Sequence, residues 1–342
     1  MSQIDCERYS RQILFPPLGR GGQDRLLKGK VLIMGLGALG TVSAGILARA
    51  GVGFLRLVDR DFVEETNLQR QVLYTEDDAR KVLPKAEAAV SRLKEINSAI
   101  TYEALVEDVN FANIDGIVSD IDLIVDAGDN FEIRYLINEI AVKKGIPWIY
   151  AACVSSYGMT FNIMPGQGAC LACALGELPA QLTETCDTAG VIGPIASLIA
   201  SVQAAEAMKI LSGNLADLNT KMRYYDLWAN RFHEFEIEKR MDCPVCQNRI
   251  FPLLAGKLKN QATYLCGRNM VQVSPAQRMN LSLEKLEEKL APLGSVQNNG
   301  YLLRFLTGKY ELMIFPDGRA LVKGTSDEAL ARSLYTRYMT TS

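Results

Sequence analysis

Hydrophobic positions in the first 250 residues alternate between short apolar runs and stretches in which apolar residues recur every three or four positions. The first pattern is typical of buried strands and the second of helices. The predicted strands cover residues 31–36, 54–59, 100–106, 121–126, 147–153, 158–164, 223–228 and 232–238. The predicted helices cover 39–50, a part of 79–96 whose start Pro84 leaves open, 131–144 and 195–211. This alternation predicts an α/β fold with a Rossmann-like, doubly wound, mostly parallel sheet that has a mixed edge.

The last part of the chain follows a different pattern. Residues 251–263 have the composition of a linker, and residues 264–342 predict a small α+β domain. Its expected elements are a first strand, helices at 281–291 and 326–338, and strands near 301–306, 310–315 and 319–322, with an Asp-Gly hairpin turn at Asp317. The predicted organisation is therefore a first domain over 1–250, a linker and a second domain over 264–342.

Composition limits the classes of function. With 342 residues, 48% of them hydrophobic, the chain can bury one full α/β core and a smaller second one. The formal net charge of −2 supplies no basic field, which argues against a nucleic-acid partner. The N-terminus has acidic residues where a signal peptide would be basic. The longest apolar run, 189–202, is shorter than the roughly 20 residues of a membrane span. We therefore expect a cytoplasmic protein without a membrane segment.

A glycine-rich turn follows the first predicted strand. Gly35, Gly37 and Gly40 form a G-x-G-x-x-G sequence, and Asp59 ends the next apolar run. In such turns the first glycine allows the tight turn, the second lets the backbone approach a phosphate, and the third lets the helix pack closely. The motif indicates a nucleotide site, and its first interpretation is NAD.

The residues after Asp59 point away from a hydride carrier. Asp61, Asn67, Arg70 and Lys85 place another acid, an amide and two cations beside the nucleotide cleft, whereas a dehydrogenase requires only the first acid. Amide and cationic donors suit phosphate oxygens. For Lys85 taken alone, the alternative is a solvated helix face.

A further carboxylate, Asp129, follows the predicted strand at 121–126. The carboxyl ends of parallel strands border the crevice in which ligands bind. Asp129 could hold Mg²⁺ against the phosphates, because hard cations prefer carboxylate oxygens. The alternative is that Asp129 caps the helix that begins near Asn130.

Cysteine and histidine usage narrows the chemistry. Four of the eight cysteines form two C-x-x-C pairs, Cys170 with Cys173 and Cys243 with Cys246. These pairs predict a structural four-cysteine zinc site. The alternative is one or two redox or incidental pairs, but a thioredoxin-like redox pair opens a helix after a strand, and neither pair is expected to do so. The one histidine, His233, lies in an alternating pattern that predicts a half-exposed strand. Chemistry without a histidine base favours phosphate positioning and charge stabilisation.

Together these motifs resemble the MoeB/ThiF/HesA-type adenylyltransferases, the bacterial relatives of ubiquitin-activating enzymes. The resemblance covers about residues 5–250, which would form the ATP-binding domain. The residues that carry it are Arg8, Arg11 and Gln12, the glycine turn, Asp59, Asp61, the run Asn67, Leu68, Gln69, Arg70 and Gln71, then Lys85, Asp129, Asn130 and the four paired cysteines. One departure is Ala38, where the family commonly has glycine.

The resemblance implies a homodimeric, zinc-containing enzyme that uses MgATP. Its substrate would be the C-terminal glycine of a small ubiquitin-like sulfur-carrier protein, activated with release of pyrophosphate for sulfur transfer in a thiamine, molybdopterin or related pathway. A sulfurtransferase or cysteine desulfurase is a possible further partner. By this likeness Arg11 reaches the ATP of the neighbouring subunit, and Asp59, Asn67, Arg70, Lys85 and Asp129 bind ATP or its metal. The carrier's carboxylate is already ionised at neutral pH, so its attack on ATP requires no general base.

Some assignments stay open at this point. Cys186 matches a loop in which some family members carry a cysteine that takes part in sulfur transfer and others do not need it, and no flanking cation lowers its pKa. The domain over 264–342 does not resemble a rhodanese domain, and the chain ends Thr-Thr-Ser rather than Gly-Gly. It is expected to dock the carrier or sulfur donor, or to cap the first domain. Two other classes are an NAD-dependent oxidoreductase and a non-catalytic carrier-binding scaffold.

Overall fold

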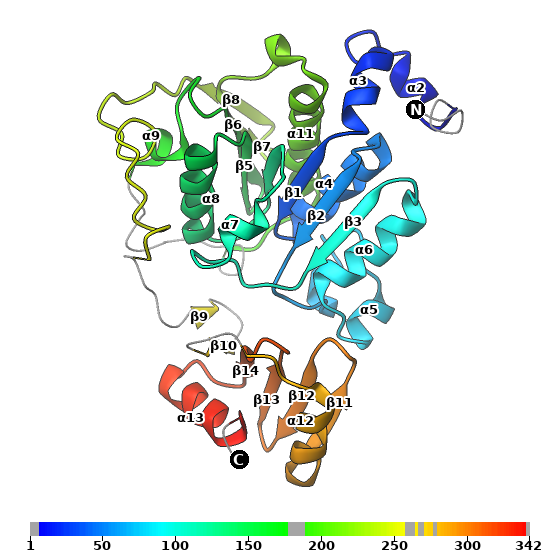
Figure 1. Cartoon of the computed structure of the whole chain (residues 1–342), viewed down its shortest axis with the longest axis vertical. Coiled ribbons are helices and arrows are strands. Elements are labelled where there is room, and N and C mark those ends of the chain that lie inside the picture. Colours follow the sequence, from blue (N-terminus) through cyan, green and yellow to red (C-terminus); the bar gives the residue numbers. More distant parts are fainter. Residues whose placement is uncertain (1–6, 177–188, 257–263, 266–269, 276–278, 340–342) are drawn as a thin grey trace. The chain divides into compact units, whose positions relative to one another are not determined.

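The computed structural model divides the chain into two compact units, Met1–Leu258 and Lys259–Ser342 (Figure 1). It describes residues 7–176, 189–256, 264–265, 270–275 and 279–339. Most of the predicted linker therefore lies outside the described residues, and the predicted boundaries at 250 and 264 stay predictions.

The first unit is built on an eight-stranded sheet whose order is β3-β2-β1-β4-β5-β6-β7-β8. Its strands are β1 Lys30–Met34, β2 Phe54–Val58, β3 Thr101–Leu105, β4 Leu123–Asp126, β5 Trp148–Val154, β6 Tyr157–Ile163, β7 Met222–Asp226 and β8 Arg231–Phe235. Strands β3, β2, β1, β4 and β5 run parallel, and β6, β7 and β8 continue the sheet antiparallel. The predicted doubly wound sheet with a mixed edge is confirmed.

Helices cover both faces of this sheet because side chains alternate along each strand. Val31 and Ile33 of β1 face one core, and Leu32 and Met34 face the other. The first core is covered by α3 Gly19–Leu26, α4 Ala38–Ala50, α6 Lys85–Ile96 and α11 Gly193–Ser212, and the second by α7 Ile114–Ile117, α8 Phe131–Lys144 and α9 Leu171–Leu175. Short elements complete the unit: α2 Ser10–Ile13, η1 Glu65–Asn67, α5 Glu76–Arg80 and η2 Leu215–Asp217.

Two prolines have effects that the sequence pattern left unresolved. Pro84 is the N-cap of α6, so the helix predicted within 79–96 starts at Lys85, and α5 ends before a turn in which Val82 has a φ of 51°. Pro194 lies in the first turn of α11, where a missing N–H costs nothing. Among the residues described, α11 alone is long and apolar enough to cross a membrane, but half of that window is buried, and α11 packs on α4 and β5. Such burial is typical of a core helix.

The second unit is a six-stranded antiparallel sheet in the order β11-β12-β13-β14-β10-β9. Its elements are β9 Tyr264–Leu265, β10 Met270–Val273, α12 Leu283–Leu290, η3 Ala291–Leu293, β11 Ser295–Asn298, β12 Leu303–Thr307, β13 Tyr310–Ile314, β14 Ala320–Lys323 and α13 Glu328–Met339. Both helices contribute to one core with Phe305 and Leu312. The predicted α+β class is confirmed, and the unpredicted strand β11 is mostly exposed.

The glycine turn yields a test of stability. A Cβ on Gly40 would lie 2.0 Å from the Gly35 carbonyl oxygen, whereas a Cβ on Gly37 would meet nothing closer than Gln71 Nε2 at 3.8 Å. We predict that Gly40→Ala lowers the free energy of unfolding by about 2–3 kcal/mol or more through overpacking, while Gly37→Ala changes it by less than about 1 kcal/mol. Urea denaturation of both variants measures this, and equal losses would contradict the assigned roles.

Candidate functional site

The glycine turn lies at the carboxyl edge of the parallel strands. Gly35 follows β1 with a φ of +96°, and its N–H donates to the Val58 carbonyl at 2.8 Å. A Cβ on Gly35 would lie 2.6 Å from the Ala127 carbonyl oxygen, so the turn is tight against the end of β4. Helix α4 begins at Ala38 without a side-chain cap or an acid in its first turn. Its first N–H groups and the positive end of its dipole therefore suit an anion.

Asp59 ties this turn to the loop after β2. Its carboxylate accepts hydrogen bonds from the Leu36 N–H at 2.7 Å and the Asp61 N–H at 2.8 Å. Burial raises the pKa of Asp59, and the nearby Lys85 opposes the rise. Asp59 thus fixes the backbone of the turn itself, and its role toward ribose stays a prediction.

Lys85 lies beside the turn and does not face solvent. Its side chain forms an ion pair with Asp61, with 3.4 Å between Nζ and Oδ2, and the residue is 3% exposed. The Lys85 N–H donates to the Asp61 carbonyl, and the buried Tyr74 hydroxyl donates to the carbonyls of Leu36 and Lys85. The alternative of a solvated helix-face lysine is therefore wrong.

The run from Asn67 to Gln71 passes the same turn. Asn67 is buried, and its Oδ1 accepts from the Glu64 N–H in a capping box. Leu68 packs on the core, Gln69 is exposed, and Arg70 donates to the Thr66 carbonyl at 2.9 Å. A Cβ on Gly193 would lie 3.2 Å from the Gln69 carbonyl oxygen, which places the start of α11 beside this run.

The loop after β4 separates the two roles weighed for Asp129. Asn130 caps α8, since its Oδ1 accepts from the Ile133 N–H at 2.9 Å. Asp129 is exposed, and its Oδ1 accepts from Asn130 Nδ2 at 3.3 Å. The capping role therefore belongs to Asn130, and the Asp129 carboxylate is accessible to a ligand.

Two arginines beside this loop were missed, Arg60, which is partly buried, and Arg134, which is buried. Arg60 forms ion pairs with Asp108 at 2.9 Å and Asp61 at 4.0 Å, and the nearby carboxylates, Asp108 foremost, raise its pKa against burial. Arg134 lies 3.4 Å from Asp126, which is fully buried at the end of β4. Burial raises the pKa of Asp126 to about 6, and Arg134 opposes the rise. The sequence signal that could have identified both arginines is their closeness to acidic residues of the motifs: Arg60 lies between Asp59 and Asp61, and Arg134 follows Asp129.

Arg11 is not brought to the other predicted residues within this chain. Its neighbours on α2 hold the opposite end of α4: Gln12 donates to the Ala50 carbonyl, and a Cβ on Gly51 would meet the Tyr9 ring. Gly37 directly precedes the first residue of α4, so this 13-residue helix separates the two places by about 20 Å. Arg11 itself is exposed. Cys186 lies outside the described residues.

The two C-x-x-C pairs meet. The Sγ atoms lie 3.9 Å apart for Cys170 and Cys173, 3.7 Å for Cys170 and Cys243, and 3.5 Å for Cys173 and Cys246. All four lie within 4.8 Å of one another. Four sulfurs around one tetrahedral metal at about 2.3 Å would be separated by about 3.8 Å, so the donor set fits such an ion. Burial raises the pKa of the Cys170 thiol to about 11, which a bound cation would offset.

Helix α8 holds the cysteine cluster from one side. Asn138 accepts from the Leu171 N–H at 3.0 Å, and Glu139 accepts from the N–H groups of Leu253 and Leu254. One expectation was wrong: Cys170 is the N-cap of the short helix α9. The redox-pair alternative still loses support, because the two pairs form one cluster.

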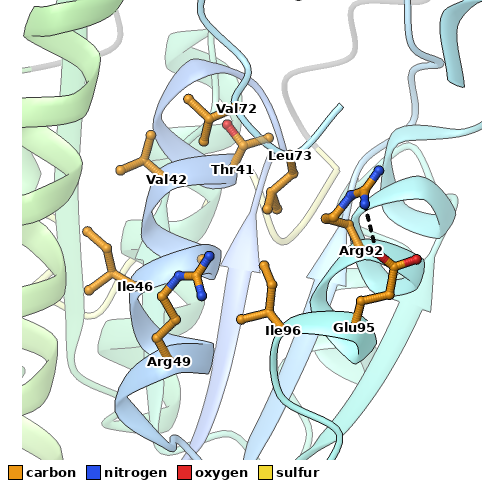
Figure 2. A pocket seen from close by; sticks show the side chains of 10 residues that line it. Thr41, Val42, Ile46, Arg49, Val72, Leu73, Arg92, Glu95 and Ile96 are labelled. Carbon is orange, nitrogen blue, oxygen red and sulfur yellow. Dashed lines mark hydrogen bonds and ion pairs between the residues drawn. The ribbon is translucent and has the colours of Figure 1, made fainter. Parts of the chain in front are cut away.

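An apolar groove of about 550 Å³ runs along α4 and α6 (Figure 2). Val42, Ile46 and Ile96 line it with Val72 and Leu73, and an Arg92–Glu95 ion pair at 2.7 Å borders it. Val72 is 62% exposed. Of the residues predicted to bind a nucleotide, none lines this groove.

Comparison with known proteins gives consistent matches. The model of the ThiF family matches residues 9–245. The chain is 45% identical over 335 residues to the sulfur carrier protein ThiS adenylyltransferase of Bacillus subtilis (strain 168), covering 97% of this chain and 99% of that protein. It is 36% identical over 247 residues to the protein of the same name from Escherichia coli (strain K12), covering 72% and 97%. The crystal structure of E. coli MccB with ATP superposes with a TM-score of 0.62 at 26% identity, over 70% of this chain and 74% of that one.

The Asp126 carboxyl predicts a pH dependence of stability. Because its folded pKa of about 6 exceeds the ordinary value of 3.8, the folded chain binds more protons between these values, and its contribution is lost as pH rises. We expect the unfolding free energy of the wild type to fall by about 2–3 kcal/mol from pH 4 to pH 7 relative to Asp126→Asn. Denaturant titrations across this range measure it, and parallel curves would contradict the assignment.

The cysteine cluster predicts a bound metal ion. Cys170→Ser is expected to lose most of the metal found by elemental analysis and to unfold at lower temperature, because one thiolate ligand is gone. Cys153→Ser is the matched control, since Cys153 is a buried thiol outside the cluster. If both variants keep the wild-type metal content, the cluster is not the metal site.

Proposed function

Because the chain belongs to the ThiF family, we propose that it adenylates the C-terminal glycine of a small ubiquitin-like sulfur-carrier protein, with ATP as the adenylyl donor and release of pyrophosphate. The observation that carries this proposal is the uncapped start of α4 beside the buried Lys85, which forms an ion pair with Asp61. Such a place suits the phosphates of a nucleotide. The similarity to a ThiS adenylyltransferase covers nearly the full chain and includes the second unit. This similarity favours a thiamine-type carrier.

The reaction requires positioning more than proton transfer. A carboxylate oxygen of the carrier attacks the α-phosphorus of ATP and forms the acyl–phosphate bond. The bond between the α-phosphorus and the bridging oxygen to the β-phosphorus breaks, and pyrophosphate leaves with its electron pair. The N–H groups of α4, Lys85 and Arg70 offset the charge on these phosphates. No base is required, which agrees with an exposed His233 on β8.

Two metals fit the residues present. Asp129, with Asn130 occupied as the helix cap, would hold the Mg²⁺ of ATP. This ion supplies charge neutralisation for the phosphates when bound. The four cysteines would hold Zn²⁺ in a closed shell of thiolates, which makes that ion structural.

A homodimer explains the position of Arg11. The end of α4 that carries α2 lies about 20 Å from the end that carries the glycine turn. If two copies pair antiparallel along α4, a two-fold axis brings Arg11 of each copy to the glycine turn of the other. The apolar groove on α4 and α6 would receive the apolar residues that follow Arg11, since Leu14 is 69% and Phe15 59% exposed. A sulfurtransferase or cysteine desulfurase would then supply sulfur to the activated carrier.

Carrier-dependent exchange of labelled pyrophosphate into ATP tests the proposal, with a purified ThiS-type carrier that ends in Gly-Gly. Asp129→Ala and Arg11→Ala are each expected to lower exchange by about 100-fold or more. Arg11→Ala removes a positive charge that would face the phosphates, and Asp129→Ala removes the carboxylate that would hold Mg²⁺ against them. Size-exclusion chromatography should show that the Asp129→Ala dimer survives.

Mixed dimers of the two variants then separate action within a subunit from action across the interface. If Arg11 acts on the partner's site, half of the randomly paired dimers contain one intact site, so exchange recovers to about a quarter of the wild-type rate. No recovery would show that Arg11 acts within its own subunit. Full exchange by Asp129→Ala alone would remove that residue from the mechanism.

A further inference from the structure

The loop that carries Asp129 is fixed from beneath by a buried arginine. Arg134 Nη2 donates to the carbonyl of Gly128 at 2.7 Å and to that of Ala151 at 3.3 Å. Arg134 Nε lies 3.4 Å from Asp126 Oδ2, and Asp126 Oδ1 accepts from the Gly128 N–H at 2.9 Å. Both backbone polar groups of the residue before Asp129 are therefore held by one buried ion pair.

Arg134 has no access to a ligand. It is 6% exposed, and its guanidinium lies over the rings of Phe131 and Tyr150, 5.2 and 5.5 Å from their centroids. Gly128 has no spare room either, since a Cβ there would lie 2.8 Å from the Ile133 side chain. The arginine can thus influence a bound nucleotide only through the loop.

We infer that Arg134 is a positioning residue for adenylation: held by Asp126, it fixes Gly128 so that the next carboxylate, Asp129, meets the magnesium ion of the nucleotide. This inference rests on the proposed function. A planar guanidinium can donate to a carbonyl and contact a carboxylate in different directions at once, which a lysine ammonium does less well. A displacement of about 1 Å in a charged group at a reacting centre can cost about 100-fold in rate.

The chain offers a matched control in Arg56 on β2. Arg56 Nε donates to Glu103 at 2.6 Å, and Nη1 donates to the carbonyls of Ile117 and Ser119 at 2.7 and 2.9 Å. Its side chain is 14% exposed. Arg56 therefore makes the same kinds of bond as Arg134, but within the described part of the chain none of these bonds reaches the Asp129 loop.

The experiment measures the affinity of the full chain for a fluorescent ATP analogue, once with Mg²⁺ and once with EDTA. The dissociation constant with EDTA, divided by the dissociation constant with Mg²⁺, isolates the contribution of the metal to nucleotide affinity. We expect Arg134→Met to lower this ratio about tenfold or more and Arg134→Lys to retain part of it, while Arg56→Met keeps the wild-type ratio. Thermal unfolding of each variant accompanies the titration, so a general loss of stability is seen separately.

The outcomes distinguish this inference from the function on which it rests. Asp129→Asn should abolish the effect of Mg²⁺. If it does, and both Arg134 variants keep the wild-type ratio, Arg134 does not position Asp129 and only this inference fails. If Asp129→Asn leaves the effect of Mg²⁺ intact, Asp129 does not hold the magnesium ion as the proposed function requires. The inference about Arg134 is then wrong as well. Should Arg134→Met not fold, Arg134→Lys decides.

Discussion

The carboxylate of Asp59 joins the two halves of the candidate site. By accepting from Leu36 and Asp61 it ties the glycine turn at the end of β1 to the loop after β2. That loop in turn holds Lys85 through the Asp61 carboxylate and carbonyl. The uncapped start of α4 and the buried cation therefore occupy fixed places before any ligand arrives. Such preorganisation is what phosphate chemistry without a general base requires.

Helix α8 links this site to the cysteine cluster. Its N-terminus carries the Asn130 cap and the Arg134 contacts to the Asp129 loop. One to two turns later, Asn138 and Glu139 hold the backbone beside Cys170 and the backbone after Cys246. A metal bound by the cysteines would thus stabilise the segments on which α8 rests. We regard the cluster as structural for this reason, in addition to its closed set of thiolates.

Periodicity and motif spacing predicted the sheet, its main helices and the meeting of the two C-x-x-C pairs. They did so because burial and the carboxyl-edge rule act on local sequence. The split between α5 and α6 was missed, since a proline can either start or break a helix. The roles of Asn130 and Arg134 were also missed. Which side chain caps α8, and which arginine is buried beneath the Asp129 loop, depends on packing against β4 and β5, and a single sequence does not display that packing.

The charged residues beside the glycine turn argue against the dehydrogenase interpretation. Hydride transfer does not require a buried lysine, such as Lys85 with its ion pair to Asp61, beside the turn. A cation at this position suits the negative charge of a triphosphate.

The most direct test of adenylation is the intact mass of a ThiS-type carrier incubated with this protein and MgATP. We predict an added adenylyl group on the carrier, which is absent when the last glycine of the carrier is removed. An unchanged mass, with the protein folded and metal-loaded, would contradict it.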